Sequence, residues 1–219
     1  MNDYIFKNLE TKKGKEKLID FLKYQTTAEY GGRQIFDGTR RHIMHNPEEL
    51  AEFIYFLKTH EKKNKIKNFL EIGYSSGKVN TIINKFFNFE HIVAVDNFLS
   101  DMSATDLLAN LPRKNLTLIC GNSDRKETLE IIKKFQPYDL IFVDGSHEYA
   151  DSKKDMNNFY KMLSKTGILA AHDIHNREFP GVNKAWNEFK LKKGFQFKEI
   201  VHKKYYFDCG MGIAVKKQS

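Results

Sequence analysis

A chain of 219 residues is long enough for one domain with a sizeable core, and its 41% hydrophobic and 13% aromatic content is typical of a packed globular protein. The 36 Lys and Arg residues exceed the 28 Asp and Glu residues, so the formal charge is +8 and favours anionic partners. Because the basic residues are spread along the chain, solvated surfaces explain them better than a nucleic-acid-binding stripe. No apolar run reaches the roughly 18 residues of a membrane-spanning helix, and no signal peptide pattern is present. We therefore expect a cytoplasmic protein.

Residues 1–45 precede the first predicted strand. We expect a helical extension followed by a glycine-containing loop, and this segment would serve either as a lid over a site or as a structural cap. The next residues, Asn46-Pro47-Glu48-Glu49, have the order of a helix start: an N-cap, a proline at the first helical position, and acids that the helix dipole favours. We therefore divide the chain into an extension, 1–45, and one main domain, 46–219.

Short apolar runs then alternate with amphipathic stretches of about ten residues, which is typical of βα units and a mostly parallel sheet. Because the runs are almost continuously apolar, we expect helices on both faces of the sheet. The predicted strands are 68–72, 92–96, 116–120, 138–143 and 168–171. The predicted helices are 76–87, 104–111, 126–135, 150–163 and 182–192.

The pattern changes in the C-terminal region. Two extended segments, 195–207 and 210–217, are joined by so short a connection that no crossover helix fits, so they must pair antiparallel. The sequence therefore predicts the α/β class, with a Rossmann-like, doubly wound sheet of seven strands. This sheet is mostly parallel, with a reversed last strand and helices on both faces.

The first strand runs into "FLEIGYSSGKVN", where Glu71, Gly73 and Gly77 precede a helix. Glycines at such a turn let the backbone approach a ligand and leave helix N-terminal amides open to it. The GxxxG spacing differs from the GxGxxG of dinucleotide-binding loops, which indicates a different nucleotide-like ligand. Asp96 ends the second strand, where a carboxylate can accept ribose hydroxyl protons.

The third strand is followed by "CGNSD", where Asn122 and Ser123 offer polar groups to an adenine ring. With "EIGYSSG", "AVD" and "VDGSH" in this order, the chain resembles the class I S-adenosylmethionine-dependent methyltransferases over about residues 46–217. The resemblance implies S-adenosylmethionine as cofactor, with the glycine loop at its amino acid part, the strand-two acid at the ribose, and the "NS" pair at the adenine. The residues that we expect at the cofactor are Glu71, Gly73, Tyr74, Ser75, Gly77, Asp96, Asn97, Asn122, Ser123 and Asp144.

Two acids end neighbouring strands. Asp144 ends the fourth strand in "VDGSHEY", and His147 follows at a distance from which it can turn back to the same pocket. Asp173 ends the fifth strand, next to His172. Because adjacent strands lie about 4.8 Å apart, the carboxylates can share one cation, and two acids with waters suit Mg²⁺ better than zinc. We expect a metal site of Asp144, Asp173 and His172.

The longer pattern "VDGSHEYADSKKDM…LSKTGILAAHD…FPGV" resembles small-molecule O-methyltransferases of the methyltransferase domain 24 type. It is more distantly similar to catechol O-methyltransferases, in which acids after strands four and five hold magnesium and a basic residue stands where this chain has His147. The resemblance implies that His147 is the catalytic base. A structural role, in which His147 caps the next helix or packs against Tyr149, stays open.

The resemblance is incomplete at the metal site. Catechol-type enzymes have an amide after the strand-five acid, where this chain has Ile174. His172, His175, Asn176 or water would then complete the coordination, and a metal-free enzyme stays open.

We therefore expect an S-adenosylmethionine-dependent O-methyltransferase acting on a hydroxyl of a small polar molecule. A sugar or nucleotide sugar is favoured over a catechol, because no aromatic clamp is evident. Mg²⁺ would lower the pKa of the hydroxyl, and His147 would remove its proton. The alternatives are an RNA methyltransferase, whose binding would weaken steeply with salt, and a non-catalytic cofactor-binding protein. We expect a small, anionic partner rather than nucleic acid or a membrane, and homo-oligomer formation stays open.

Overall fold

The computed structural model describes residues 8–9, 11–26, 43–99, 114–203 and 209–217. It contains one seven-stranded sheet in the order β3-β2-β1-β4-β5-β7-β6. The strands are β1 Asn68–Ile72, β2 His91–Asp96, β3 Leu116–Cys120, β4 Tyr138–Val143, β5 Leu163–His172, β6 Phe195–Ile200 and β7 Met211–Lys216. The helices are α2 Lys12–Lys23, α3 Pro47–Glu61, α4 Lys78–Asn84, α6 Lys126–Lys133, α7 Tyr149–Phe159, the short 3-10 helix η2 Tyr160–Met162, and α8 Pro180–Phe189.

Most of the sheet is parallel. β1 pairs in parallel with β2 and β4, β2 with β3, and β4 with β5. β7 lies between β5 and β6 and runs antiparallel to both. The predicted α/β class, the seven strands and the reversed last strand are therefore confirmed. The position of β7 between β5 and β6 was not predicted.

β5 is longer than predicted, because it begins at Leu163 rather than at residue 168. The polar residues 164–166 interrupt the apolar run in the sequence. The backbone nevertheless keeps pairing with β4, through a register shift between Tyr138 and Leu140. A bulge of this kind accommodates extra residues without ending the strand.

Helix bounds also differ from the predictions. The helix predicted over 76–87 begins only at Lys78, because Gly77 precedes it with a left-handed φ of 72°. The helix predicted over 182–192 begins two residues earlier, at Pro180, whose fixed φ suits the first helical position. The helix predicted over 104–111 lies outside the described residues.

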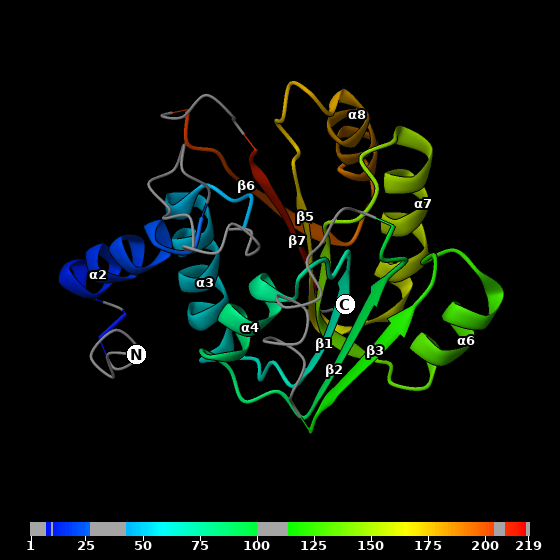
Figure 1. Cartoon of the computed structure of the whole chain (residues 1–219), viewed down its shortest axis with the longest axis horizontal. Coiled ribbons are helices and arrows are strands. Elements are labelled where there is room, and N and C mark those ends of the chain that lie inside the picture. The colour runs from blue at the N-terminus through cyan, green and yellow to red at the C-terminus, as the bar shows by residue number, and fades with distance from the viewer. Residues whose placement is uncertain (1–7, 10, 27–42, 100–113, 204–208, 218–219) are drawn as a thin grey trace.

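The helices cover both faces of the sheet, as predicted: α2, α3 and α4 lie on one side, and α6, α7 and α8 on the other (Figure 1). Alternate residues along a strand pack into the hydrophobic cores on opposite sides of the sheet. Phe69 and Phe142 join the core cluster on the side of α2, α3 and α4, whereas Leu70 and Val143 join the cluster on the opposite side. Burial of both faces explains why the strands are almost continuously apolar.

α3 begins as predicted. Asn46 accepts hydrogen bonds from the backbone N–H groups of Glu48 and Glu49, and Pro47 is the first helical residue. In the predicted extension, α2 packs against α3 and buries Leu18. The glycine-containing loop predicted before α3 falls among residues 27–42, outside the described residues. Within the described ranges, no helix combines the length and apolarity needed to cross a membrane.

Candidate active site

Three residues at the carboxyl edge of the sheet have left-handed backbone conformations that are uncommon outside glycine. Ser75 follows β1 with a φ of 46°, Phe98 follows β2 with 54°, and Asp173 follows β5 with 60°. Strained residues gather at functional sites, and ligands of open α/β sheets bind where the parallel strands end. This edge is therefore the candidate site.

A cleft of about 890 Å³ opens along the same edge, beside the ends of β1, β2, β3 and β4. Its volume lies in the range of sites for small molecules and cofactors. The predicted cofactor residues that line it are Gly73, Ser75, Asp96, Asn97, Asn122, Ser123 and Asp144, and His147 lines it as well. The other predicted cofactor residues, Glu71, Tyr74 and Gly77, lie outside this lining.

The glycine loop is shaped by close packing within the protein. A Cβ on Gly73, whose φ is 89°, would lie 1.9 Å from the carbonyl oxygen of Asp144. A Cβ on Gly77 would lie 2.2 Å from Cζ of the Tyr74 ring. The buried Glu71 accepts a hydrogen bond of 2.7 Å from Asn80 Nδ2 and so connects β1 to α4. Contacts within the chain therefore suffice to require both glycines, which the sequence attributed to ligand approach.

Asp96 organises the loops after β1 and β2. Its Oδ2 accepts from the backbone N–H of Ser75 at 2.7 Å, and its Oδ1 accepts from the N–H of Phe98, also at 2.7 Å. Nearby, Asn97 Nδ2 donates to Asn122 Oδ1 at 3.0 Å. Asp96, which was predicted to bind the ribose, and Asn122, which was predicted to bind the adenine, thus belong to one polar rim of the cleft.

Asp155 is a site residue that was not predicted. It lies on α7, is almost fully buried, lines the cleft, and accepts a hydrogen bond of 2.5 Å from Ser123 Oγ. Burial, together with the nearby Asp151 and Asp124, raises its pKa to about 6. In the sequence it stands in "DSKKDM", which has the composition of an exposed helix face, so only the fold indicates its position.

Asp144 lies among imidazole rings. His172 Nδ1 is 3.2 Å from Asp144 Oδ1 and 3.3 Å from Asp173 Oδ2. His45 Nε2 is 3.4 Å from Asp144 Oδ2, and the His45 ring stacks on the His172 ring with centroids 3.8 Å apart. The three residues predicted for a metal therefore do come together. His45, from the end of the predicted extension, was not predicted to join them.

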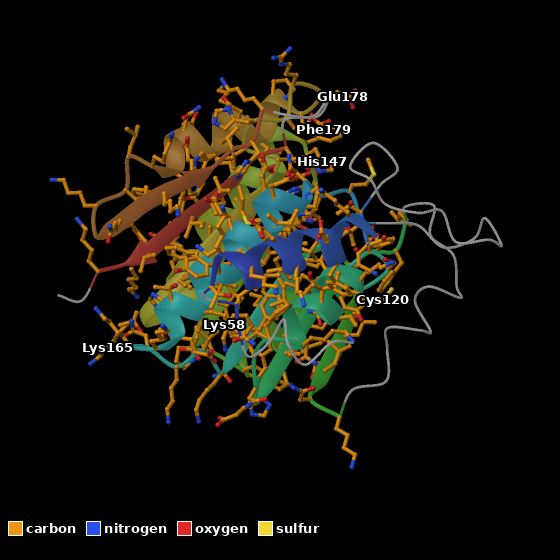
Figure 2. The ribbon with its side chains drawn as sticks, turned by 90° about the vertical axis from the view of Figure 1, so that its left-hand side faces the viewer. Lys58, Cys120, His147, Lys165, Glu178 and Phe179 are labelled. Carbon is orange, nitrogen blue, oxygen red and sulfur yellow. The ribbon has the colours of Figure 1, made fainter. Side chains whose placement is uncertain are left out.

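Asp173 is held by two further side chains. His147 Nε2 lies 3.0 Å from its Oδ2, and Asn176 Nδ2 donates to its Oδ1 at 2.9 Å. The His147 ring stacks on Phe179, with centroids 3.8 Å apart and planes inclined by 7°. Figure 2 shows these two residues near one end of the molecule. His147 therefore packs against Phe179 rather than Tyr149, and α7 has no side-chain N-cap hydrogen bond.

The charges of the cluster follow from burial and ion pairing. Burial opposes a charged His172, but Asp173 and Asp144 outweigh this effect and raise its pKa well above the ordinary value. Burial opposes charge on both carboxylates, yet the His172 imidazolium holds their pKa values below the ordinary range, and His147 and Asn176 add to this effect at Asp173. The pKa of His147 is raised, because Asp173 outweighs the effect of burial. The pKa of His45 is lowered, by burial and by the neighbouring His172.

The donor atoms decide which cation the cluster fits. Mg²⁺ prefers six oxygen ligands, whereas each carboxylate here faces imidazole nitrogens. Both ring nitrogens of His45 and Nε2 of His172 are buried without a hydrogen-bond partner among the described residues. Unpartnered buried polar atoms are unusual, and imidazole nitrogen is a common metal ligand. The residues therefore fit a divalent cation with mixed nitrogen and oxygen ligands.

The other residues considered as metal ligands have different neighbours. His175 Nε2 lies 3.5 Å from Glu199 Oε2. Asn176 instead holds the Asp173 carboxylate.

The fold and the site together define a class of protein. The reversed strand β7 in an otherwise mostly parallel sheet, with a cleft beside Asp96 and the glycine loop, is the architecture expected of a class I S-adenosylmethionine-dependent methyltransferase. Residues 70–174 match the model of a family described as Methyltransferase domain. The recognition made from the sequence and the assignment as a methyltransferase are therefore confirmed. No sequence among curated proteins matches the chain.

Solved structures share the fold. A proposed O-methyltransferase from Klebsiella pneumoniae aligns over 91% of this chain and 90% of its own, with 13% identity and a TM-score of 0.62. The O-methyltransferase from Bacillus cereus in complex with SAH aligns over 98% and 96%, with 12% identity and a TM-score of 0.59. The O-methyltransferase TomG from Streptomyces achromogenes, involved in tomaymycin synthesis and in complex with SAM, aligns over 92% and 90%, with 12% identity and a TM-score of 0.59. At such identities the likeness concerns the fold.

Proposed function

We propose that this protein transfers the methyl group of S-adenosylmethionine to a hydroxyl of a small polar acceptor, with His147 as the base. The observation that carries the proposal is the Asp173–His147 pair, 3.0 Å apart, in which His147 lines the same cleft as Asp96, Asn122 and Asp144. A base beside a cofactor cleft is what transfer to a hydroxyl requires, because a neutral hydroxyl is a poor nucleophile.

The reaction follows from this arrangement. Asp173 binds the Nε2 side of His147 and leaves Nδ1 to take the acceptor proton, as a carboxylate orients the imidazole in other acid–base sites. The acceptor oxygen then forms a bond to the methyl carbon while the carbon–sulfur bond breaks. The electron pair of that bond stays on sulfur, which leaves as the neutral thioether S-adenosylhomocysteine. Alignment of acceptor and methyl group is the main further requirement.

The stacked Phe179 supports the role of His147. Face-to-face contact with a ring 3.8 Å away restrains the imidazole plane, and the Asp173 contact restrains its rotation within that plane. A base held in one orientation needs less reorganisation during the reaction.

A divalent cation held by Asp144, His172 and Asp173, expected from the sequence to be Mg²⁺, would polarise the acceptor hydroxyl and lower its pKa. The proximity of these three side chains supports the proposal. Methyl transfer should then be lost in EDTA and return when the cation is restored.

We propose a sugar, nucleotide sugar or related metabolite as the acceptor class. The net charge of +8 supports an anionic acceptor, and Lys126 and Lys154 line the cleft. Phe179 is an aromatic residue that the sequence did not place at the site. Since sugars and phenols both stack on aromatic rings, catechols belong in the acceptor panel as well.

The test measures S-adenosylmethionine binding by calorimetry and methyl transfer to sugars, nucleotide sugars and catechols, with and without EDTA. We expect His147→Ala to lower kcat by about 10²–10⁴-fold, the usual contribution of a positioned base. Its affinity for S-adenosylmethionine should be unchanged. His91→Ala, which removes an exposed imidazole at the start of β2, should leave both quantities unchanged.

Full turnover by His147→Ala would remove this residue from the mechanism. Absence of S-adenosylmethionine binding near millimolar cofactor would contradict the proposed function as a whole.

A further inference from the structure

The imidazole cluster around Asp144 carries an inference about the cation that goes beyond the magnesium site expected from the sequence. We propose that His45, His172 and Asp144 form a site for one divalent ion of the imidazole-binding class, such as Zn²⁺, Co²⁺ or Fe²⁺. This inference concerns the metal of the proposed methyltransferase site, but it rests on the donor atoms and can be tested without any acceptor.

The spacing of the donor atoms supports a shared ion. Ligand atoms of all three residues lie within 4.8 Å of one another. His45 Nε2 is 3.4 Å from Asp144 Oδ2, and His172 Nδ1 is 3.2 Å from Asp144 Oδ1. Two ligands bound at 2.0–2.2 Å to a tetrahedral ion are roughly 3.3–3.6 Å apart. The cluster therefore has nearly the separations that ligation requires.

Hydrogen bonding explains this cluster only in part. The His172 Nδ1 contact with Asp144 is a hydrogen bond, whereas the His45 Nε2 contact lacks hydrogen-bond geometry. Three nitrogens, the pair of His45 and Nε2 of His172, are buried without a partner among the described residues. His45 is 2% exposed and His172 is 4% exposed, so bulk solvent does not satisfy these atoms. Metal ligation through His45 Nε2 and His172 Nδ1 would satisfy one of the two unpartnered nitrogens of His45.

The donor chemistry selects among metals. Two imidazoles and one carboxylate suit zinc and the divalent ions of iron and cobalt, while Mg²⁺ prefers oxygen ligands and retained waters. Cys209 also lies close to the cluster, since its sulfur groups with donor atoms of His172 and Asp173 within the same 4.8 Å. A thiol neighbour is consistent with a site for softer ions.

The proposal replaces the ligand set of Asp144, His172 and Asp173 expected from the sequence, because it gives the two carboxylates separate roles. Asp173 already has its Oδ1 bound by Asn176 and its Oδ2 beside His147, so it acts as the partner of the base. Asp144 has one oxygen beside each of the two proposed imidazole ligands, so it is the metal ligand. The ligand set thus combines the segment before α3, the end of β4 and the end of β5.

The test is metal binding by the full chain, freed of metal by dialysis against a chelator and studied without cofactor or acceptor. We expect Co²⁺ to bind with a stoichiometry of one and to give visible absorption bands that Zn²⁺ abolishes. Mg²⁺ in thousand-fold excess should not displace it. His45→Ala should weaken Co²⁺ binding at least tenfold, whereas the matched control His91→Ala should not change it.

Because His45 is buried, the variant could fail to fold, and circular dichroism checks this. X-ray absorption of the Zn²⁺-loaded parent protein provides a second measurement, with two imidazole ligands expected. Mg²⁺ binding as tight as Co²⁺ binding, unaltered Co²⁺ affinity in folded His45→Ala, or fewer than two imidazoles would each overturn the proposal. If the ion binds as described and no methyl transfer is found, the proposed function fails while the metal site stands.

Discussion

The carboxyl group of Asp155 is an example of a single residue whose environment sets its chemistry. It is buried at the cleft, with Ser123 Oγ as hydrogen-bond donor, and the effect of its burial outweighs the opposing effects of Ser123 and of the Lys154 charge. The group therefore releases its proton only near pH 6 instead of at its ordinary value of 3.8.

This environment predicts a pH-dependent stability. Between pH 4 and 6 the folded protein binds the Asp155 proton while the unfolded chain has released it, so this residue lowers stability as pH rises through about 6. Asparagine has the same shape and no charge. We expect Asp155→Asn to raise the free energy of unfolding at pH 8 by up to about 3 kcal/mol and to have little effect near pH 4. Urea denaturation of both proteins across this range measures the difference, and parallel curves would contradict the argument.

Individual site residues could be predicted where a polar side chain stands at the end of a buried strand. Asp96, Asp144, His172 and Asp173 could be found because a buried apolar run stops at or beside each of them. The sequence could not indicate three other site residues, His45, Asp155 and Phe179. None of them stands at the end of a buried apolar run. Their positions depend on tertiary packing, which brings residue 45 beside residue 172.

At the scale of elements, hydrogen bonds join the beginning of α3 to the residues that follow β6 and precede β7. Glu49, fully buried, accepts from the backbone N–H of His202 at 2.8 Å and of Gly210 at 3.0 Å. The neighbouring Asn46 side chain donates to the carbonyl of His202. These contacts fix the end of the helix from which His45 extends, so they also define the proposed metal site.

Loss of the Glu49 carboxylate should therefore destabilise the protein. Glu49→Ala leaves the buried N–H of Gly210 and the partly buried N–H of His202 without this acceptor, and the buried group alone costs roughly 1–3 kcal/mol. Glu52→Ala on the same helix is the matched control, because Glu52 also contacts His202 but lies on the exposed surface. An exposed ion pair of this kind contributes about 0–1 kcal/mol. Urea denaturation should separate the two variants clearly, and equal losses would contradict this account of α3.

The elements themselves were largely predictable, because both faces of the sheet are buried and the apolar runs are distinct. The exceptions have physical causes. β5 continues through polar residues because its backbone pairs with β4 on both sides of them, at Leu163 and again from Ile168. The order β5-β7-β6 could not be predicted, since local pattern defines a hairpin but not the edge to which it adds.

At the scale of the whole molecule, the cofactor cleft connects parts of the chain that are distant in sequence. Its lining comes from the ends of β1, β2, β3 and β4 and from α7. A ligand that contacts all of them can bind only the folded protein. Binding should therefore stabilise the entire fold.

We expect S-adenosylmethionine at one hundred times its Kd to stabilise the protein by about 2.7 kcal/mol. For a chain of this size the melting temperature should rise by roughly 5–10 °C. Differential scanning fluorimetry measures the shift. ATP at the same concentration is the control, because a protein of charge +8 attracts anions without specificity. An equal shift with ATP would attribute the effect to charge.

The position of β7 has a consequence for how the protein is made. β6 pairs with the sheet through β7 and not through β5, although β6 precedes β7 in the chain. During synthesis on the ribosome, the strands that form the cleft emerge first and can pair with one another. β6 emerges before β7 and has no partner in the sheet until β7 has been synthesised. The nascent chain therefore passes through a stage in which β5 is an open edge and β6 is an unpaired segment. At this stage an intermolecular strand pairing, and hence aggregation, competes most strongly with correct folding.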